Sequence, residues 1–333
     1  MRLNHKIIGP GHPCFIIAEM SANHCQSYQK AVSIVKAAAK AGADAIKLQT
    51  YTPDTLTIQS DKKWFRVGGK DNPKSWHKQT FYDLYQKAYM PWDWQPKLQQ
   101  LAHRLGLIFI STPYDTTAVD FLEKLKVPAY KIASYECIDI PLLKHIAKTK
   151  KPVIMSVGFA SFQEIDLSVK TLRAHGTRHL ALLHCLTSYQ REGKTYQSNL
   201  RTMLDLTKKF NCVVGFSDNM GGIDIPLLAV ATGASIIEKH FIDRHTPKAL
   251  DDSFSLDAKE FKTMVDQIRW QEQVMGKVKY GPQTPEEAAN LQFRRSLFVV
   301  KDIQKGDKFT LKNVMSIRPG YGLAPKFLDQ IIG

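Results

Sequence analysis

The sequence is poor in cysteine and has no long apolar stretch. Its five cysteines form no CxxC pair and are odd in number, which argues against a disulfide framework and against a zinc site of paired cysteines. Reduced thiols are typical of the cytoplasm, where we expect the protein to act. No run approaches the ~20 apolar residues of a membrane-spanning helix. The opening MRLNHKIIGPGHP also lacks the apolar segment of a signal peptide, so we expect no membrane association.

Acidic residues are also scarce relative to basic ones. The 31 Asp and Glu residues face 46 Lys and Arg, a formal net charge of +15. The basic residues are scattered, without a tract interleaved with aromatics and without a recognised nucleic-acid motif, so no nucleic-acid partner is predicted. A positive field of this kind speeds the capture of a small anionic substrate.

Eight short apolar runs recur along most of the chain, and nearly all end in charged or hydroxylic residues. The runs are Phe15 to Glu19, Ala45 to Gln49, Leu107 to Thr112, Ala129 to Ser134, Pro152 to Ser156, Leu180 to Cys185, Val213 to Asp218 and Ser235 to Phe241. Continuous apolar runs are typical of parallel strands that are buried on both faces. In a (β/α)8 barrel the ends of such strands form the active site. The pattern predicts this α/β TIM-barrel fold, with a doubly wound open sheet as the alternative.

Segments with helical spacing separate the runs, as in Gln29 to Ala41, which ends at Gly42. We assign residues 1–275 to the barrel, 276–295 to a linker and 296–333 to a small module of short strands. Such a module is too small to bury much core alone, so we expect it to pack against a partner.

Residues 51–90 are too long for a simple connection. A loop of this length on the catalytic side of a barrel is usually a lid or a substrate wall, although a surface insertion is the alternative.

The residues at the strand ends form a chemically mixed set. Cations and hydroxyls suit an oxyanion through charge-assisted hydrogen bonds, and they are Lys47, Thr112, Lys131, Ser134, Ser156 and Ser217. Carboxylates can act in general acid–base catalysis or bind a metal, and they are Glu19, Glu136, Asp218 and Glu238. Imidazoles come from His24, His184 and His240. The set predicts a site that binds an anionic substrate and that also transfers a proton or binds a metal.

Each of these residues also has a purely structural interpretation. Lys47 or Lys131 could reach past a strand end to pair with a carboxylate, and Glu238 could lie in a buried ion pair. His184 lies within an apolar run, which favours a core histidine over a ligand. The hydroxyls could cap the helices that follow them. Function is favoured because one polar group per strand falls at the end where this architecture places its active site.

Eight motifs, in order along the chain, resemble those of the nonulosonic (sialic) acid synthase family. They are IIAEMSANH (16–24), AGADAIKLQTY (41–51), STPYD (111–115), VPAYKIASYE (127–136), GFSDN (215–219), IEKHF (237–241), DDSFSL (251–256) and IRPGYGLAP (317–325). Two further stretches, 48–57 and 81–94, resemble the branch of this family that makes pseudaminic acid.

The resemblance implies a (β/α)8 barrel followed by a small SAF (antifreeze-like) domain. It also implies a domain-swapped homodimer in which the C-terminal module covers the barrel of the partner. By the same resemblance, residues 296–333 form an SAF domain that stops one strand short.

The family condenses phosphoenolpyruvate with an N-acetylated amino-sugar aldehyde, releases phosphate and uses a divalent metal, Mn²⁺ or Mg²⁺. For this chain the implied sugar is 2,4-diacetamido-2,4,6-trideoxy-altrose. An N-acetylneuraminate or legionaminate synthase is one alternative. A catalytically weakened paralogue that binds sugar or regulates the pathway is another.

The resemblance also implies residue roles. The clamp for phosphoenolpyruvate comprises Lys47, Thr112, Lys131, Ser134, Ser156 and Ser217. The catalytic carboxylates that handle the attacking water and its protons are Glu19 and Glu136. The sugar contacts are Gln49, Tyr189 and Asp251, with Arg318 inserted from the other subunit.

The departure from the family pattern that matters most for the chemistry concerns the metal site. Of the two metal-binding histidines of the family, His240 is retained and Asn219 stands in place of the other. An amide oxygen is a harder and weaker ligand than imidazole, and it suits Mg²⁺ or Mn²⁺ better than softer metals. We therefore expect a metal site of His240 and Asn219 with weak binding.

Overall fold

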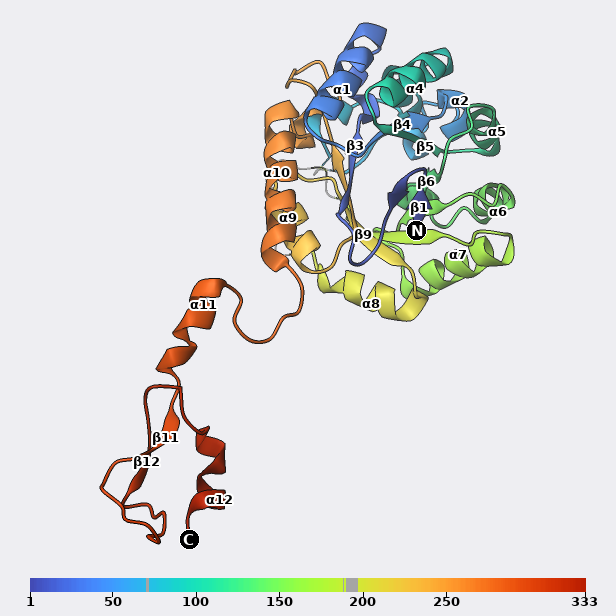
Figure 1. Cartoon of the computed structure of the whole chain (residues 1–333). Coiled ribbons are helices and arrows are strands. Elements are labelled where there is room, and N and C mark those ends of the chain that lie inside the picture. Colours follow the sequence, from blue (N-terminus) through green and yellow to red (C-terminus); the bar gives the residue numbers. More distant parts are fainter. Residues whose placement is uncertain (70–71, 188, 190–196) are drawn as a thin grey trace. The chain divides into compact units, whose positions relative to one another are not determined.

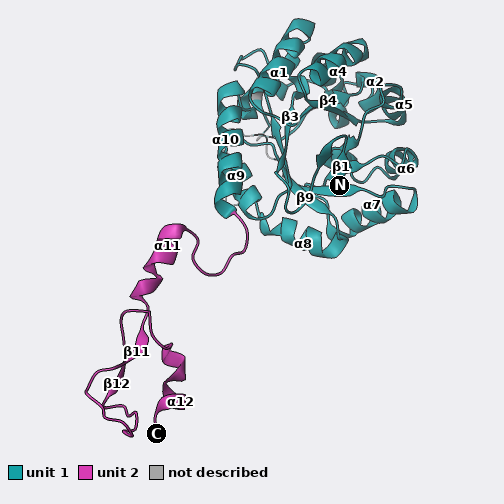
Figure 2. Cartoon of the chain, in the orientation of Figure 1, with its two compact units in different colours: residues 1–275 teal, residues 276–333 magenta. Residues whose placement is uncertain are grey.

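The chain consists of two compact units, Met1–Met275 and Gly276–Gly333 (Figure 2). A computed structural model describes residues 1–69, 72–187, 189 and 197–333. Within these residues, no helix combines the length and the apolarity needed to cross a membrane.

The first unit is a closed parallel barrel, which confirms the predicted TIM-type fold (Figure 1). In the described residues its strands are β3 (Phe15–Glu19), β4 (Ala45–Thr50), β5 (Ile108–Pro113), β6 (Tyr130–Ile132), β7 (Val153–Ser156), β8 (Leu180–Leu186), β9 (Val213–Asp218) and β10 (Ile236–His240). The last strand pairs with the first, since Ile237 lies opposite Ile16 and His240 opposite Glu19. This pairing closes the sheet and excludes the open doubly wound alternative.

Helices follow the strands and cover the barrel (Figure 1). In the first unit the described α-helices are α1 (Tyr28–Lys40), α2 (Pro53–Leu56), α3 (Phe81–Ala88), α4 (Gln95–Arg104), α5 (Thr116–Lys124), α6 (Ile140–Lys148), α7 (Phe162–Ala174), α8 (Arg201–Phe210), α9 (Asp224–Ala231) and α10 (Ala258–Met275). Several of these helices begin after a residue whose side chain accepts hydrogen bonds from the backbone amides of the first turn. Asp115 accepts hydrogen bonds from two amides of α5, and Ser161 forms a capping box with Glu164 in α7.

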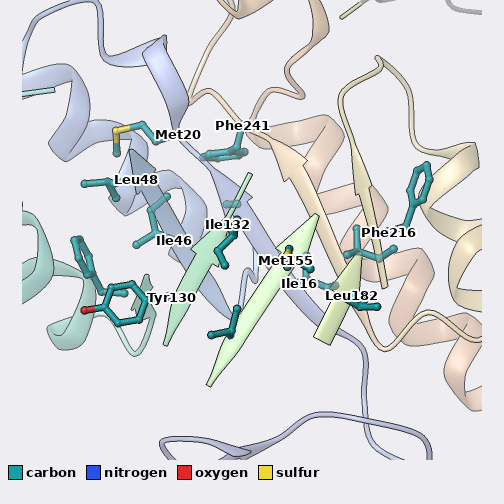
Figure 3. Packing of buried hydrophobic residues seen from close by; sticks show 14 of the residues in the cluster. Ile16, Met20, Ile46, Leu48, Tyr130, Ile132, Met155, Leu182, Phe216 and Phe241 are labelled. Atoms are coloured by element: carbon teal, nitrogen blue, oxygen red, sulfur yellow. The ribbon is translucent and has the colours of Figure 1, made fainter. Parts of the chain in front are cut away.

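Strand alternation separates two apolar clusters. Outward-facing residues such as Ile46 and Leu48 join the larger cluster between strands and helices (Figure 3). The inward cluster fills the start of the barrel and includes Ile17 and Ala45. A hairpin of β1 (Arg2–Leu3) and β2 (Lys6–Ile7) adds Leu3 to this inner cluster.

The next inward positions along the strands are polar. In β4, Ala45 belongs to the inner apolar cluster, and two and four residues later the same face carries Lys47 and Gln49. The polar residues therefore gather at the carboxyl end of the barrel, and the inner apolar cluster fills the opposite end.

Gly215 in β9 shows how tightly the barrel interior is packed. A Cβ atom at this position would lie 2.3 Å from the Ile236 carbonyl oxygen and 2.7 Å from Leu183 Cδ2. No other residue fits there without moving a neighbouring strand.

The second unit contains a small antiparallel sheet of β11 (Ser296–Val299) and β12 (Val314–Ile317). Two short helices accompany it, α11 (Pro285–Ala289) and α12 (Leu328–Ile331). The stretch predicted as a linker, 276–295, thus contains helix α11. Among the apolar side chains of this unit that the structure describes, Leu297 and Val314 are buried.

Candidate active site at the carboxyl end of the barrel

A cavity of about 540 Å³ opens at the carboxyl ends of the strands. Most of the residues predicted from the sequence line it. They are Glu19, Lys47, Gln49, Lys131, Ser134, Glu136, Ser156, Tyr189, Ser217, Asn219, His240 and Asp251.

Of the residues to which the family resemblance gives a role within the barrel, Thr112 lies outside the lining. Thr112 is fully buried below the surface of the cavity, where its Oγ1 accepts a hydrogen bond from Lys47 Nζ at 3.2 Å. Arg318 follows β12 in the second unit and is exposed.

The cavity floor is a network of buried charges. Lys47 Nζ lies 2.7 Å from Glu19 Oε2 and 3.7 Å from Glu238 Oε1. Lys131 Nζ lies 3.5 Å from the same Glu238 oxygen. Glu238 thus bridges the two lysines, as the structural interpretation of this residue anticipated. Because all four residues also line the cavity, the network is available to a ligand.

Hydroxyl groups complete this floor. Lys131 Nζ donates to Ser156 Oγ at 2.7 Å, and Ser217 Oγ donates to Glu238 Oε1 at 3.0 Å. Ser134 Oγ accepts from the Gly158 amide at 3.1 Å, so it is anchored to the loop after β7. Donors from several strands therefore converge on one end of the cavity.

The two lysines differ in how well their charges are compensated. Burial opposes the charge of Lys47, but the carboxylates of Glu19 and Glu238 outweigh this effect and raise its pKa. Burial lowers the pKa of Lys131 despite the attraction of Glu238. A buried cation with too little counter-charge is stabilised when an anion binds beside it. The floor is therefore suited to a small, highly charged anion.

Two carboxyl groups are suited to proton transfer. Burial raises the pKa of Glu136 to about 7, and its Oε2 atom is buried without a hydrogen-bond partner. Burial also raises the pKa of Glu19, against the pull of Lys47, and Gln49 Nε2 donates to Glu19 Oε1 at 2.9 Å. A carboxyl group whose pKa lies near neutrality can both take up and return a proton during turnover.

His240 and Asn219 have the properties expected of ligands for a hard divalent ion. Burial, with help from Lys47, lowers the pKa of His240 to about 3, so its imidazole is neutral. Its Nδ1 atom is buried without a hydrogen-bond partner. Asn219 Nδ2 donates to Cys185 Sγ at 3.4 Å, which leaves the amide oxygen for a cation. Both side chains line the cavity. This donor set fits a metal with open coordination positions.

A second group that could hold a metal ion lies outside this cavity. Among the described residues it comprises His245, Asp257 and Glu260. Asp257 and Glu260 cap the start of α10, because each accepts a hydrogen bond from the backbone amide of the other. His245 Nδ1 also lies 2.9 Å from Asp252 Oδ1. The cluster therefore has a structural role, because its hydrogen bonds cap α10 and hold His245 against Asp252.

Aromatic side chains that the sequence did not single out form one wall. The rings of Trp76 and Phe254 lie 5.1 Å from that of Tyr189, and the ring of Phe254 lies 4.8 Å from that of His240. Asn72 and Cys185 also line the cavity. The only sequence signal for Asn72 and Trp76 was the length of the 51–90 segment, which indeed contributes to the cavity wall.

Three predicted rim residues do not reach the cavity lining. Asp218 points away from the barrel axis and forms a buried ion pair with Lys239. His184 Nε2 lies 2.8 Å from the Ser198 carbonyl oxygen, and burial lowers its pKa, as suits a structural histidine. His24 is buried against the edge of Trp94.

The chain is similar to known proteins over almost its whole length. Residues 34–280 match the NeuB family, and residues 294–333 match the SAF domain. A pseudaminic acid synthase of Campylobacter jejuni is 41% identical over 96% of this chain and 91% of that protein. An N,N'-diacetyllegionaminic acid synthase of Legionella pneumophila is 36% identical over 98% of this chain and 91% of that protein.

A solved structure agrees with these similarities. The N-acetylneuraminic acid synthetase from Leptospira borgpetersenii, in complex with citrate, superimposes with a TM-score of 0.76 at 30% identity, covering 87% of this chain and 94% of that one. The barrel and its polar cavity thus define an enzyme of the sugar-acid synthase class. The chain belongs to the NeuB family and carries an SAF domain at its C-terminal side.

Proposed function

We propose that this enzyme condenses phosphoenolpyruvate with 2,4-diacetamido-2,4,6-trideoxy-altrose, releases phosphate and so acts as a pseudaminic acid synthase. The observation that carries the proposal is the buried pair of Lys47 and Lys131 on the cavity floor. Phosphoenolpyruvate carries a phosphate and a carboxylate, which match two cations and several hydroxyl donors. The similarity to the Campylobacter jejuni enzyme supports the choice of sugar.

In the proposed mechanism the floor holds phosphoenolpyruvate through Lys47, Lys131 and the hydroxyls of Ser134, Ser156 and Ser217. Thr112 acts from below the floor, because its Oγ1 accepts a hydrogen bond from Lys47 Nζ and so positions this cation.

Carbon 3 of phosphoenolpyruvate attacks the open-chain aldehyde carbon with the electron pair of its double bond to carbon 2, and a carbon–carbon bond forms. The π bond of the aldehyde carbonyl breaks, its oxygen takes up a proton to become a hydroxyl group, and cationic character develops at carbon 2. Water then adds at carbon 2, and Glu136 accepts its proton. The bond between carbon 2 and the phosphate oxygen breaks, and phosphate leaves with the electron pair of this bond. The hydroxyl group at carbon 2 loses its proton and becomes the keto group of the product. Glu19, held by Lys47 and Gln49, stabilises the cationic character that develops at carbon 2.

His240 and Asn219 are the residues that would hold Mn²⁺ or Mg²⁺. When bound, the ion would supply Lewis acidity at the aldehyde oxygen. Gln49, Tyr189 and Asp251 would contact the sugar. Asp251 is already oriented, since its Oδ2 accepts a hydrogen bond from the Ala22 amide at 3.2 Å.

Phosphate release separates this proposal from its alternatives. The enzyme is incubated with phosphoenolpyruvate, Mn²⁺ and one sugar at a time. Fastest release with the diacetamido-trideoxy-altrose supports the proposal. Fastest release with N-acetylmannosamine or with the legionaminate precursor assigns one of the other synthase activities. No release with any sugar would support the alternative of a weakened paralogue. That alternative is favoured by Asn219, which stands where the family has a metal-binding histidine.

We place the enzyme in the cytoplasm as a domain-swapped homodimer in which Arg318 enters the cavity of the partner. The five cysteines are free, which fits a reducing compartment. The second unit exposes Leu311, Met315 and Tyr321, and such apolar side chains are available to a partner.

The pH dependence of the reaction tests the role of Glu136. Because burial raises the pKa of this carboxyl group to about 7, its ionised form, the base, is populated above that pH. We expect kcat/KM to rise from pH 6 to pH 8 with an inflection near 7, and Glu136→Gln to remove the inflection. Glu164→Gln, on the exposed start of α7, is the matched control and keeps the profile. An unchanged profile in Glu136→Gln would assign the proton transfer to another group.

Metal binding tests the role of Asn219. Asn219→His adds an imidazole to a site that is otherwise short of strong ligands, so we expect Mn²⁺ to bind about 10- to 100-fold more tightly. Titration of free Mn²⁺ by electron paramagnetic resonance measures this without turnover. His240→Ala is expected to abolish binding, and Asn290→His, at the end of α11, should leave it unchanged. If the affinity is the same in Asn219→His and His240→Ala as in the wild type, the metal assignment is wrong.

A further inference from the structure

One side of the active-site cavity is apolar, in contrast to its charged floor. This apolar wall consists of Leu56, Val67, Phe81, Leu84 and Ala88, all from the segment between β4 and α4. Leu84 is buried at 6% exposure, and the other four are at least half-buried. The wall faces the same cavity as Asn72 and Asp251, which can form hydrogen bonds.

The apolar wall is braced against the barrel. Its Phe81 ring stacks on Tyr85 with centroids 6.0 Å apart, and Tyr85 contacts Tyr51 at 5.8 Å. Tyr51 follows directly after β4 and contacts Tyr114, after β5, at 5.1 Å. This chain of rings ties the wall to two strand ends.

Helix α3, which carries Phe81 and Leu84, is also fixed at its start. Thr80 forms a capping box with Asp83, and Tyr82 on the first turn donates to Asp54 in α2 at 3.2 Å. A surface braced in this way can discriminate by shape and polarity, because it cannot easily rearrange to supply a hydrogen bond.

We propose that the apolar wall determines sugar specificity by contacting methyl groups of the substrate, namely the deoxygenated terminal carbon and an acetamido methyl. This inference rests on the proposed function. A sugar hydroxyl placed against Leu84 or Phe81 would lose its water without gaining a partner. An apolar pocket rejects such an added hydroxyl only moderately, by roughly 10- to 100-fold.

The test uses two sugar aldehydes of the same configuration, the 6-deoxy diacetamido sugar and its 6-hydroxy analogue. We expect kcat/KM for the 6-deoxy sugar to exceed that for the 6-hydroxy sugar by roughly 10- to 100-fold in the wild type. Leu84→Asn, which keeps the branching at Cγ and the number of side-chain heavy atoms, is expected to reduce this ratio at least several-fold without changing KM for phosphoenolpyruvate. If Leu84→Asn folds poorly, Val67→Thr replaces it in the test. This isosteric change of a half-buried residue should also lower the ratio of the two kcat/KM values. Ile58→Asn, at an exposed position of the same segment, is the matched control and keeps the ratio.

The outcomes separate the two proposals. Equal use of both sugars by the wild type, with phosphate released, would overturn the specificity inference and leave the synthase activity standing. An unaltered ratio in both Leu84→Asn and Val67→Thr would also overturn it. Failure to release phosphate with either sugar would reject the proposed function and the inference together.

Discussion

Replacement of Lys131 by methionine is expected to lower kcat/KM for phosphoenolpyruvate by roughly 10²- to 10³-fold, the loss typical of removing one donor from a preorganised anion site. Lys131 is 1% exposed, and its Nζ contacts Ser156 and Glu238 on the cavity floor. Burial lowers the pKa of this lysine, so a bound anion would supply the counter-charge that the protein's own carboxylates provide only in part. Steady-state kinetics at varied phosphoenolpyruvate measure the change.

Methionine is preferred to alanine at this position because the buried stem of Lys131 fills part of the barrel interior. Truncation to alanine would add a cavity effect to the loss of charge. Lys148→Met, on the exposed end of α6, is the control and should retain wild-type kinetics. Wild-type kinetics in Lys131→Met would remove this residue from the anion site and leave it a structural role alone.

Replacement of Glu238 by glutamine is expected to lower the free energy of unfolding by about 3 to 5 kcal/mol at pH 7. The change removes the carboxylate that bridges two buried lysines, and Lys131 loses its nearest counter-charge. Chemical denaturation measures the loss.

The pH dependence of this loss has a definite sign. Without Glu238, the pKa of Lys131 in the folded protein falls further below its unfolded value, so protonation of this lysine opposes folding. The deficit should therefore shrink as pH rises from 7 to 9 and Lys131 loses its proton. Asp266→Asn removes an exposed partner of Lys262 and should cost less than about 1 kcal/mol at any of these pH values. A Glu238→Gln deficit as small as this control would contradict the bridging role.

Much of the candidate site could be predicted from the local pattern of the sequence. Each strand is a short apolar run, and in a parallel barrel the residues at the ends of such runs meet at one rim. This is why Lys47, Lys131 and Ser156 were placed together from the sequence and line one cavity.

Strand alternation explains why Asp218 does not line the cavity, and why His184 has the structural position that the sequence favoured. Ser217 faces the cavity, so its neighbour Asp218 must face outward, where it pairs with Lys239. By the same alternation, Cys185 lines the cavity and the adjacent His184 does not. Counting alternate positions along these strands would have excluded Asp218 and added Cys185 to the predicted lining.

The sequence by itself determined the barrel, the end at which its polar groups collect and the presence of a small second unit, because these depend on periodicity along the chain. Only the tertiary structure decided that Glu238 bridges two lysines, that the pKa of Glu136 rises to about 7, and which side chains form the cavity walls. The contacts of Trp76 with Phe254 and of Tyr51 with Tyr114 join segments far apart in the chain. Such contacts and the burial that shifts a pKa arise only when the barrel closes, so no local pattern records them.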